Sequence, residues 1–191
     1  MVKLDDVDKQ IISILRKNGR RSYKKIGDDI GYSLMGTKRR FLKLVDEEII
    51  KVTANVNINK LGYKLALTLL EVENQTQLNK ILEKFKKCPR AVMVFTMLAG
   101  YNLAVITVAE DQKTLESESW EKCSWRNQQG VRRSEFYPIE ETHYSSFLPV
   151  REELMRGELD KAPCGVDCGE CRRYKSDKCL GCPATKYYKE K

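Results

Sequence analysis

The sequence predicts an α+β protein with three segments: a helical domain at 1–57, a ferredoxin-like βαββαβ domain at 58–150 and a small metal-stabilised tail at 151–191. Three observations support this division. Apolar residues recur with helical spacing in the first segment, and the second alternates between strand and helix periods. Five of the seven cysteines lie in the third. We expect the first segment to be a winged helix-turn-helix.

Composition narrows the class of protein. No apolar run approaches the roughly 20 residues that a membrane span needs, and we find no secretory signal at the start of the chain. We therefore expect a cytoplasmic protein, in which clustered cysteines are more often metal ligands or redox groups than disulfides. The net charge is +8, and the first segment alone has 13 Lys and Arg against 8 Asp and Glu, a balance of +5. Acidic partners such as nucleic acid are expected there.

The first segment predicts three short helices in close succession. Apolar residues at 7–15 form one helical face, and Ser22 can cap a second helix that Gly31 ends. Ser33 can cap a third helix directly after it, which is the short connection of a helix-turn-helix. A β-rich stretch at 49–54 follows.

The third helix has a basic outward face. With Phe41 at the centre of its buried side, Leu44 and Val45 lie within about 60° of it at 100° per residue. Gly36 lies on the opposite side and leaves the backbone bare enough to approach a phosphate. The alternative is an ordinary solvated surface, but the tight turn before the helix favours DNA binding. The residues expected to contact DNA are Arg20, Arg21, Lys24, Lys25, Ser33, Gly36, Lys38, Arg39, Arg40 and Lys43.

The middle segment predicts the order βαββαβ. Two helices cover one face of such a sheet, and the other face needs a partner, so we expect a homodimer. The expected elements are a strand at 65–72, a helix through 78–85, strands at 91–97 and 103–108 with a turn at Gly100-Tyr101-Asn102, a helix at 111–125 and a strand at 131–137 that Pro138 ends.

Residues 4–150 resemble the Lrp/AsnC family of transcription regulators. The resemblance implies a winged helix-turn-helix that reads double-stranded DNA, a βαββαβ domain that forms dimers and in some cases octamers, and a small effector, often an amino acid, bound between dimers. The matching residues are Leu4-Asp5, Asp8, Ile11, Leu15, Asn18-Gly19-Arg20, Ser22, Ile26-Gly27, Ile30-Gly31, Ser33, Arg40, Leu44, Ile50, Leu98-Ala99-Gly100-Tyr101-Asn102 and Gly130-Val131.

Two positions depart from the family pattern. Glu48 stands where the family usually has a glycine after its recognition helix, although a left-handed residue there favours glycine. Asn102 stands where the family often has an acidic residue, and a neutral amide holds an ammonium group less well than a carboxylate does. Gly100, Tyr101 and Asn102 are the candidate effector-binding residues, and the alternative is a plain hairpin turn.

The tail carries the spacing C-x3-C-x2-C-x7-C-x2-C. Too few apolar residues lie here to bury a core, so a metal is expected to hold the segment together. Two Cys-x-x-Cys pairs are typical of a four-thiolate site, and zinc is slightly favoured over a [4Fe–4S] cluster. The candidate metal ligands are Cys164, Cys168, Cys171, Cys179 and Cys182, with Cys164 the one most easily spared.

Three further expectations concern the surroundings of this segment. Residues 151–161 could form a polar linker helix. Cys88 and Cys123 are isolated in the sequence, and core packing is their default interpretation.

The leading functional hypothesis is a DNA-binding transcription regulator, not an enzyme, with a metal-bearing tail. One rival is an enzyme like the siroheme decarboxylases, which share this architecture, but the chain offers one histidine, His143. The other rival is a metal-dependent adaptor that binds protein through the cysteine pairs. A dimeric regulator would place two recognition helices in successive major grooves of a palindromic site, about 34 Å apart.

Overall fold

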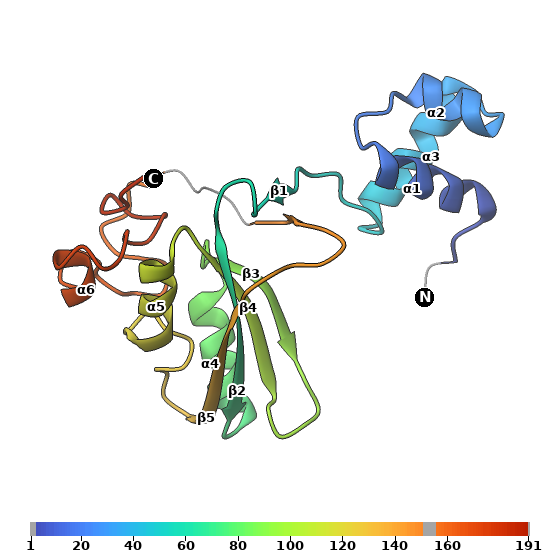
Figure 1. Ribbon diagram of the computed structural model, residues 1–191. Helices are drawn as coiled ribbons and strands as arrows, with labels where there is room; N and C mark the ends of the chain where they lie inside the picture. The colour runs from blue at the N-terminus through green and yellow to red at the C-terminus, as the bar shows by residue number, and fades with distance from the viewer. Residues whose placement is uncertain (1–2, 151–155, 191) are drawn as a thin grey trace. The chain divides into compact units, whose positions relative to one another are not determined.

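The computed structural model describes residues 3–150 and 156–190 and divides into two compact units, residues 1–54 and 55–191 (Figure 1). Within the described ranges, no helix combines the length and apolar character that a bilayer crossing requires. The predicted boundary at residue 57 lies three residues beyond the division between the units.

The N-terminal unit consists of α1 (Asp6–Lys17), α2 (Tyr23–Ile30) and α3 (Leu34–Asp46). Each helix begins at a side-chain cap. Asp5 and Asp8 form a capping box at α1, Ser22 accepts a hydrogen bond from the amide of Lys25, and Ser33 accepts one from the amide of Gly36. These caps confirm the predicted starts of α2 and α3. The buried centre of the unit contains one residue from each helix, Ile11, Ile26 and Leu44.

The turn between α2 and α3 depends on two glycines. Gly31 adopts the left-handed conformation with φ 71° and ends α2, as predicted. Gly27 lies where α2 meets the turn, and a Cβ there would be 2.5 Å from the carbonyl oxygen of Tyr32 and 2.9 Å from Oγ1 of Thr37. The close approach of α3 to α2 therefore requires a residue without a side chain at position 27.

The predicted β-rich stretch at 49–54 is wrong. These residues, all of them described, form no strand, and the first strand of the chain is β1 (Val56–Asn57) in the other unit. Alternating β-branched residues favour extended backbone, but a strand needs a partner, and β1 pairs with β6 (Phe147–Leu148). Glu48 after α3 departs from the family pattern in residue type but adopts φ 54°, the left-handed conformation that glycine usually takes.

The C-terminal unit contains the expected βαββαβ domain. Its sheet is antiparallel with the strand order β3-β4-β2-β5, and the predicted fold class is confirmed. The elements are β2 (Lys64–Val72), α4 (Gln75–Phe85), β3 (Ala91–Thr96), β4 (Leu103–Ala109), α5 (Gln112–Trp120) and β5 (Val131–Ile139).

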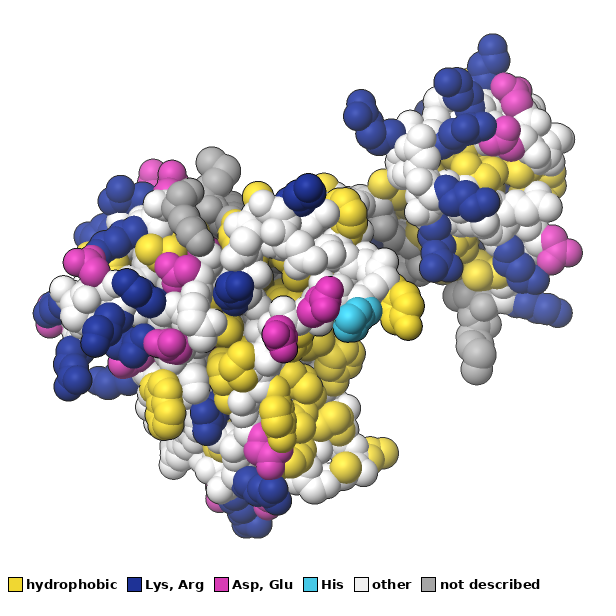
Figure 2. Space-filling model, in the orientation of Figure 1, with side chains coloured by type: hydrophobic (Ala, Val, Ile, Leu, Met, Phe, Trp, Pro, Cys, Tyr) yellow, Lys and Arg dark blue, Asp and Glu magenta, His cyan; other side chains and the backbone are white. Residues whose placement is uncertain are grey.

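Both helices pack on the same face of this sheet. Leu70 and Val72 of β2 are buried with Phe85 of α4, while Ala66 of the same strand is buried with Leu115 of α5. Residues two and four apart on a strand share a face, so α4 and α5 cover one side. The opposite side exposes large apolar residues, and Figure 2 shows hydrophobic side chains gathered over the strands. Its most exposed members include Met93, Phe95 and Tyr137.

Two predicted element ends are wrong. The helix expected at 111–125 ends at Trp120, which is 71% exposed, while Trp125 beyond it is buried and stacks on Phe85 at 4.1 Å. The last strand continues through Pro138, which pairs with Ala66. Because β5 is an edge strand, a proline there loses no ladder hydrogen bond on its outer side.

The tail packs against the βαββαβ domain. Among its described residues the tail forms one short helix, α6 (Arg172–Lys175), and Leu159 forms an isolated parallel bridge with Thr185. The predicted linker helix at 151–161 is wrong for its described part, because residues 156–161 are not helical, and residues 151–155 lie outside the described residues. Figure 1 shows the tail beside α5.

Candidate functional site

The outer face of α3 is the first candidate site. Thr37 and Leu44 are buried and fix the rotation of the helix, so the residues near 180° from them point to solvent. Arg39 lies closest to the middle of that side, Lys38 and Lys43 lie on its two flanks, and all three are exposed. Together with apolar and polar neighbours they line a shallow open groove along the helix, made by Ser33, Met35, Gly36, Lys38, Arg39, Leu42, Lys43, Asp46 and Glu47. A cationic, solvent-facing helix directly after a tight turn can enter a DNA groove.

Arg40 does not belong to this free cationic face. Its guanidinium pairs with Asp5 and with Oδ1 of Asp8, the latter at 3.1 Å, and lies 5.8 Å from the ring centre of Tyr32. The hydrogen bonds that Arg40 donates to Asp5 and Asp8 raise the pKa of Arg40, and the amide of Asp8 together with Arg40 lowers the pKa of Asp5. Arg40 therefore ties α3 to the beginning of α1, which the outward-face prediction did not anticipate.

The cationic side chains of α2 and of the loop before it differ in exposure and in ion pairing. Arg20, Lys24 and Lys25 are exposed. The guanidinium of Arg21 instead contacts the Asp29 carboxylate at 2.6 Å, an ion pair within α2 and its approach. Three of the four predicted backbone contacts are thus available at the surface.

The structure gives a second reason for glycine at position 36, besides the close approach of its backbone to a phosphate. A Cβ at this position would lie 3.1 Å from Oγ of Ser33 and 3.4 Å from Cδ1 of Tyr32. The absent side chain leaves room for the cap that starts α3.

The candidate effector residues form a braced hairpin. Asn102 accepts a hydrogen bond from the amide of Val72 at 2.8 Å and donates one to the same residue's carbonyl at 2.7 Å. The side-chain amide therefore holds the end of β2 to the β3–β4 turn. Arg133 lies 5.0 Å over the ring of Tyr101, and Gly100 has open space around it. Through its two hydrogen bonds to Val72, Asn102 therefore stabilises the sheet.

The second candidate site is a buried cavity of about 50 Å³ in the C-terminal unit. All seven cysteines of the chain line it, together with Arg90, Glu118 and Tyr174 among others. Five of these cysteines are the predicted ligands, Cys164, Cys168, Cys171, Cys179 and Cys182. The other two, Cys88 and Cys123, were expected to be isolated core residues, and the structure brings them to the same cavity.

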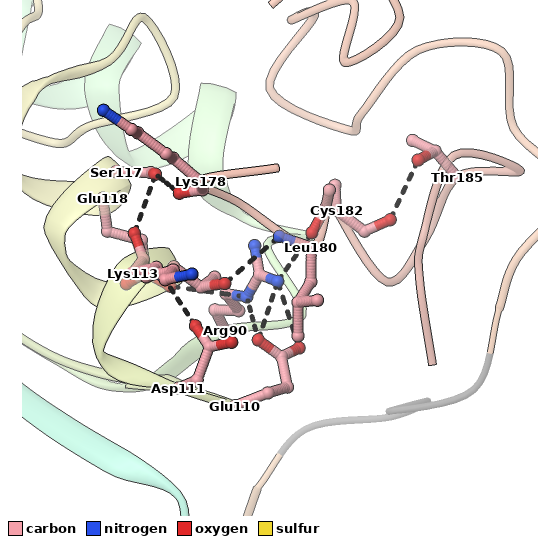
Figure 3. Close-up of polar contacts among 12 residues, drawn as sticks. Arg90, Glu110, Asp111, Lys113, Ser117, Glu118, Lys178, Leu180, Cys182 and Thr185 are labelled. Carbon is pink, nitrogen blue, oxygen red and sulfur yellow. Dashed lines mark hydrogen bonds and ion pairs between the residues drawn. The ribbon is translucent and has the colours of Figure 1, made fainter. Parts of the chain in front are cut away.

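Arg90 connects the sheet domain to the tail at this cavity. Its guanidinium donates to Glu110 at 2.8 Å and to the carbonyl oxygen of Gly181, between two tail cysteines, at 2.6 Å. A second carboxylate, that of Glu118, lies 3.4 Å away. Figure 3 shows Arg90 between Glu110 and the tail segment around Leu180. Since Arg90 and Glu110 are almost fully buried, the pair depends on this geometry.

Burial and charge act against each other in this network. Burial alone lowers the pKa of Arg90, but Glu110 and Glu118 raise it by more, so the guanidinium stays charged. Burial raises the pKa of Glu118 to about 8, although Arg90 opposes that shift. The site therefore has one firmly charged cation facing two carboxylates, one of which takes up a proton readily.

Helix α5 provides the remaining contacts to the tail. Nε of Arg173 donates to Oγ of Ser117 at 2.6 Å, and that hydroxyl donates to the carbonyl of Lys178 at 2.9 Å. The amide of Leu180 donates to Oγ1 of Thr114 at 3.2 Å. These bonds seat the second cysteine pair on the helix and place it against the cavity.

Backbone amides and burial shift the pKa values of the cysteines in opposite directions. The amides of Arg90 and Ala91 lower the pKa of Cys88, and the amides of Gly181 and Ala184 lower the pKa values of Cys179 and Cys182 in turn. Burial outweighs them, and it raises the pKa of Cys88 to about 11 and that of Cys182 to about 12.

The residues that line the cavity fit a metal in the chemistry of their donor atoms. Soft thiol donors and a nearby guanidinium suit zinc or an iron–sulfur cluster. Among the described residues, no three His, Cys, Asp or Glu side chains converge at the geometry that one ion requires. Side-chain rotation within the cavity would have to accompany binding.

Sequence reasoning missed Cys88, Cys123 and Arg90. One signal was present: Cys88-Pro89 repeats the Cys-Pro pair at Cys182-Pro183. Their convergence depends on the packing of α4, α5 and the tail, which local spacing does not encode.

The N-terminal unit matches a known type of domain. Residues 4–45 match the model of the AsnC-type helix-turn-helix domain. An uncharacterised HTH-type transcriptional regulator, PH1055 of Pyrococcus horikoshii, is 31% identical over 118 residues, which are 60% of this chain and 74% of that protein. The HTH-type transcriptional regulator Ptr1 of Methanocaldococcus jannaschii is 26% identical over 113 residues, 59% of this chain and 76% of its own.

Solved structures extend the similarity to the fold. The crystal structure of PH0061, from Pyrococcus horikoshii, superposes with a TM-score of 0.69 at 26% identity and covers 76% of this chain and 98% of its own. The structure of E. coli AsnC superposes with a TM-score of 0.67 at 16% identity, over 75% of this chain and 97% of its own. About a quarter of this chain has no counterpart in either structure.

Proposed function

This chain belongs to the Lrp/AsnC family and is a DNA-binding transcription regulator; from that premise we propose that it binds palindromic DNA as a homodimer through the outer face of α3. The observation that carries the proposal is the exposure of Lys38, Arg39 and Lys43 on a helix whose opposite face is buried. Cations held at fixed positions on a rigid helix can contact phosphates and guanine edges together.

The cations before and within α2 support the same docking. Arg20, Lys24 and Lys25 are exposed and would contact the phosphate backbone beside the groove that α3 enters. Arg40 would act indirectly, because its ion pairs with Asp5 and Asp8 orient α3 on α1.

The apolar face of the sheet supports a dimer. Both helices cover the other side, so Met93, Phe95 and Tyr137 stay exposed within one chain. A twofold partner would cover them and place two copies of α3 in successive major grooves, about 34 Å apart. Further assembly to an octamer, and a small effector near Gly100, Tyr101 and Asn102, remain predictions that rest on the family resemblance.

The cysteine tail is proposed to hold a metal centre, with zinc slightly favoured over [4Fe–4S]. Support comes from the gathering of Cys164, Cys168, Cys171, Cys179 and Cys182 around one buried cavity. Four thiolates suffice for either centre. Purified protein distinguishes the two classes by colour, because a cluster absorbs visible light and zinc does not.

A salt-titrated gel shift tests the DNA-binding face. Replacing Arg39 and Lys43 by Gln removes two cations per subunit, four per dimer, and the slope of log K against log salt should flatten by about 2–4. The matched control replaces Lys60 and Lys80, two exposed lysines of the other unit, by Gln. Equal affinity and slope in the Arg39 and Lys43 variant and the wild type would contradict the proposed face.

A further inference from the structure

The cysteine cavity unites two parts of the C-terminal unit that are distant in sequence. Cys88 follows α4 and Cys123 follows α5, whereas the other five cysteines belong to the tail. Cys88 and Cys164 pack against the same apolar cluster, and Cys123 lines one cavity with all five tail cysteines. The cysteines of the domain and of the tail therefore border one shared space.

The sequence around Cys88 resembles that around one tail cysteine. Cys88 and Cys182 each precede a proline. Both line the same cavity, and the guanidinium of Arg90, two residues after Cys88, donates a hydrogen bond to the carbonyl of Gly181, next to Cys182. The segments that carry the two Cys-Pro pairs are therefore bonded to each other at the cavity wall.

We propose that this cavity is the site of a thiophilic metal centre, of the zinc or iron–sulfur class, in which Cys88 and Cys123 supply thiolates alongside the tail cysteines. The proposal deepens the tail metal site proposed above and rests on it. Each sulfur that binds zinc releases one proton to solvent as its bond to the metal forms, and no electron is transferred.

Two features of the surroundings favour a shared centre. The guanidinium of Arg90 lies at the cavity wall, bonded to the carbonyl of Gly181, and its positive charge offsets that of metal-bound thiolates. The sulfurs also need little backbone movement to converge. Each cysteine can move its sulfur among three staggered χ1 rotamers, which re-aims the donor while the chain stays in place.

A shared centre has a structural consequence that a tail-only site lacks. Metal bonds from Cys88 and Cys123 would fasten the tail to the ends of α4 and α5, in addition to the hydrogen bonds of Arg90, Ser117 and Thr114. Metal removal should then loosen the tail from a folded sheet domain. The regulator would thus carry a metal-dependent connection within the domain that the family uses for dimerisation.

Cadmium-113 bound to the metal-stripped full chain tests the proposal directly. Cadmium takes thiolate ligands as zinc does, and scalar coupling from the metal to cysteine β-protons identifies each ligand by NMR. We expect couplings to Cys88 and Cys123 as well as to tail cysteines. Couplings confined to tail cysteines would overturn the shared centre and leave the tail site standing. Absence of any bound cadmium would overturn both.

Zinc affinity of variants provides an independent measurement. Loss of an outer-shell partner already weakens metal binding by 10–100-fold, so replacing Cys88 and Cys123 by Ala should weaken zinc at least about tenfold in competition with a chelator. Ser124→Ala is the control, because this buried serine adjoins Cys123 but does not line the cavity. Unchanged zinc affinity in the folded double variant would contradict the proposal. The salt-titrated gel shift tests DNA binding by the α3 face separately from metal binding.

Discussion

The two units of the chain place their charged groups in opposite environments. In the N-terminal unit, Lys38, Arg39 and Lys43 face solvent while an apolar centre holds the helices together. In the C-terminal unit, Arg90 and Glu110 are buried beside the cysteine cavity and take part in holding the tail. An exposed charged side chain can bind a partner from solution, whereas a buried one must already be paired within the protein. The first unit therefore presents its cations to partners in solution, and the second uses its buried charges to join the tail to the sheet domain.

The largest effect should follow loss of the buried cation. Arg90→Met leaves Glu110 and Glu118 buried without their guanidinium, and breaking a buried ion pair costs about 3–5 kcal/mol. Urea unfolding followed by tryptophan fluorescence reports this unit, because Trp120 and Trp125 both lie in it.

Arg132→Met is the matched control, since Arg132 is exposed in the same unit and should change the unfolding free energy little. A similar midpoint for Arg90→Met and the control would show that the buried network contributes no stability.

The next effect concerns the N-terminal unit alone. Gly27→Ala places a Cβ 2.5 Å from the Tyr32 carbonyl oxygen, and such overpacking should destabilise this unit by about 2 kcal/mol. Thermal unfolding followed by helical circular dichroism measures the change. Gly100→Ala is the control because its Cβ would meet open space. If both variants melted like the wild type, α2 and α3 could not approach as closely as the structure has them.

A smaller effect of opposite sign is expected at the end of α3. Glu48 adopts φ 54°, and a left-handed residue with a side chain is strained by roughly 1–2 kcal/mol. Glu48→Gly relieves that strain but adds freedom to the unfolded chain, so a net gain of about 0.5–1 kcal/mol is expected. A lower unfolding midpoint for this variant would contradict the left-handed exit.

These positions show what local sequence can predict. Ser22, Gly31 and Ser33 act within a few residues of themselves, so the caps and the turn were readable. Arg40 and Cys88 act on partners that are 32 or more residues away in sequence, and their roles depend on packing. The β-rich prediction for 49–54 is wrong for a related reason. A strand forms only beside a partner strand, and its own sequence does not specify that partner.

The smallest effect is a pH dependence of the N-terminal unit. The pKa of Asp5 is lowered from its usual 3.8, so the folded state holds this proton less well than the unfolded state does. Its contribution is present above 3.8 and is lost as the pH falls through the lower folded value. Arg40→Gln removes one cause of the shift, and its unfolding midpoint should fall less steeply than that of the wild type between pH 4 and pH 2. Parallel slopes would show that Asp5 and Arg40 are not coupled.

Lysine acetylation of the protein with and without DNA tests the central claim most directly. Mass spectrometry then compares the modification of Lys38 and Lys43 on α3 with that of Lys60 and Lys80 in the other unit, all of them exposed in the free chain. We expect bound DNA to protect the two α3 lysines and to leave the other two reactive. Unchanged acetylation of Lys38 and Lys43 in a DNA complex would contradict the assignment of α3 as the surface that meets DNA.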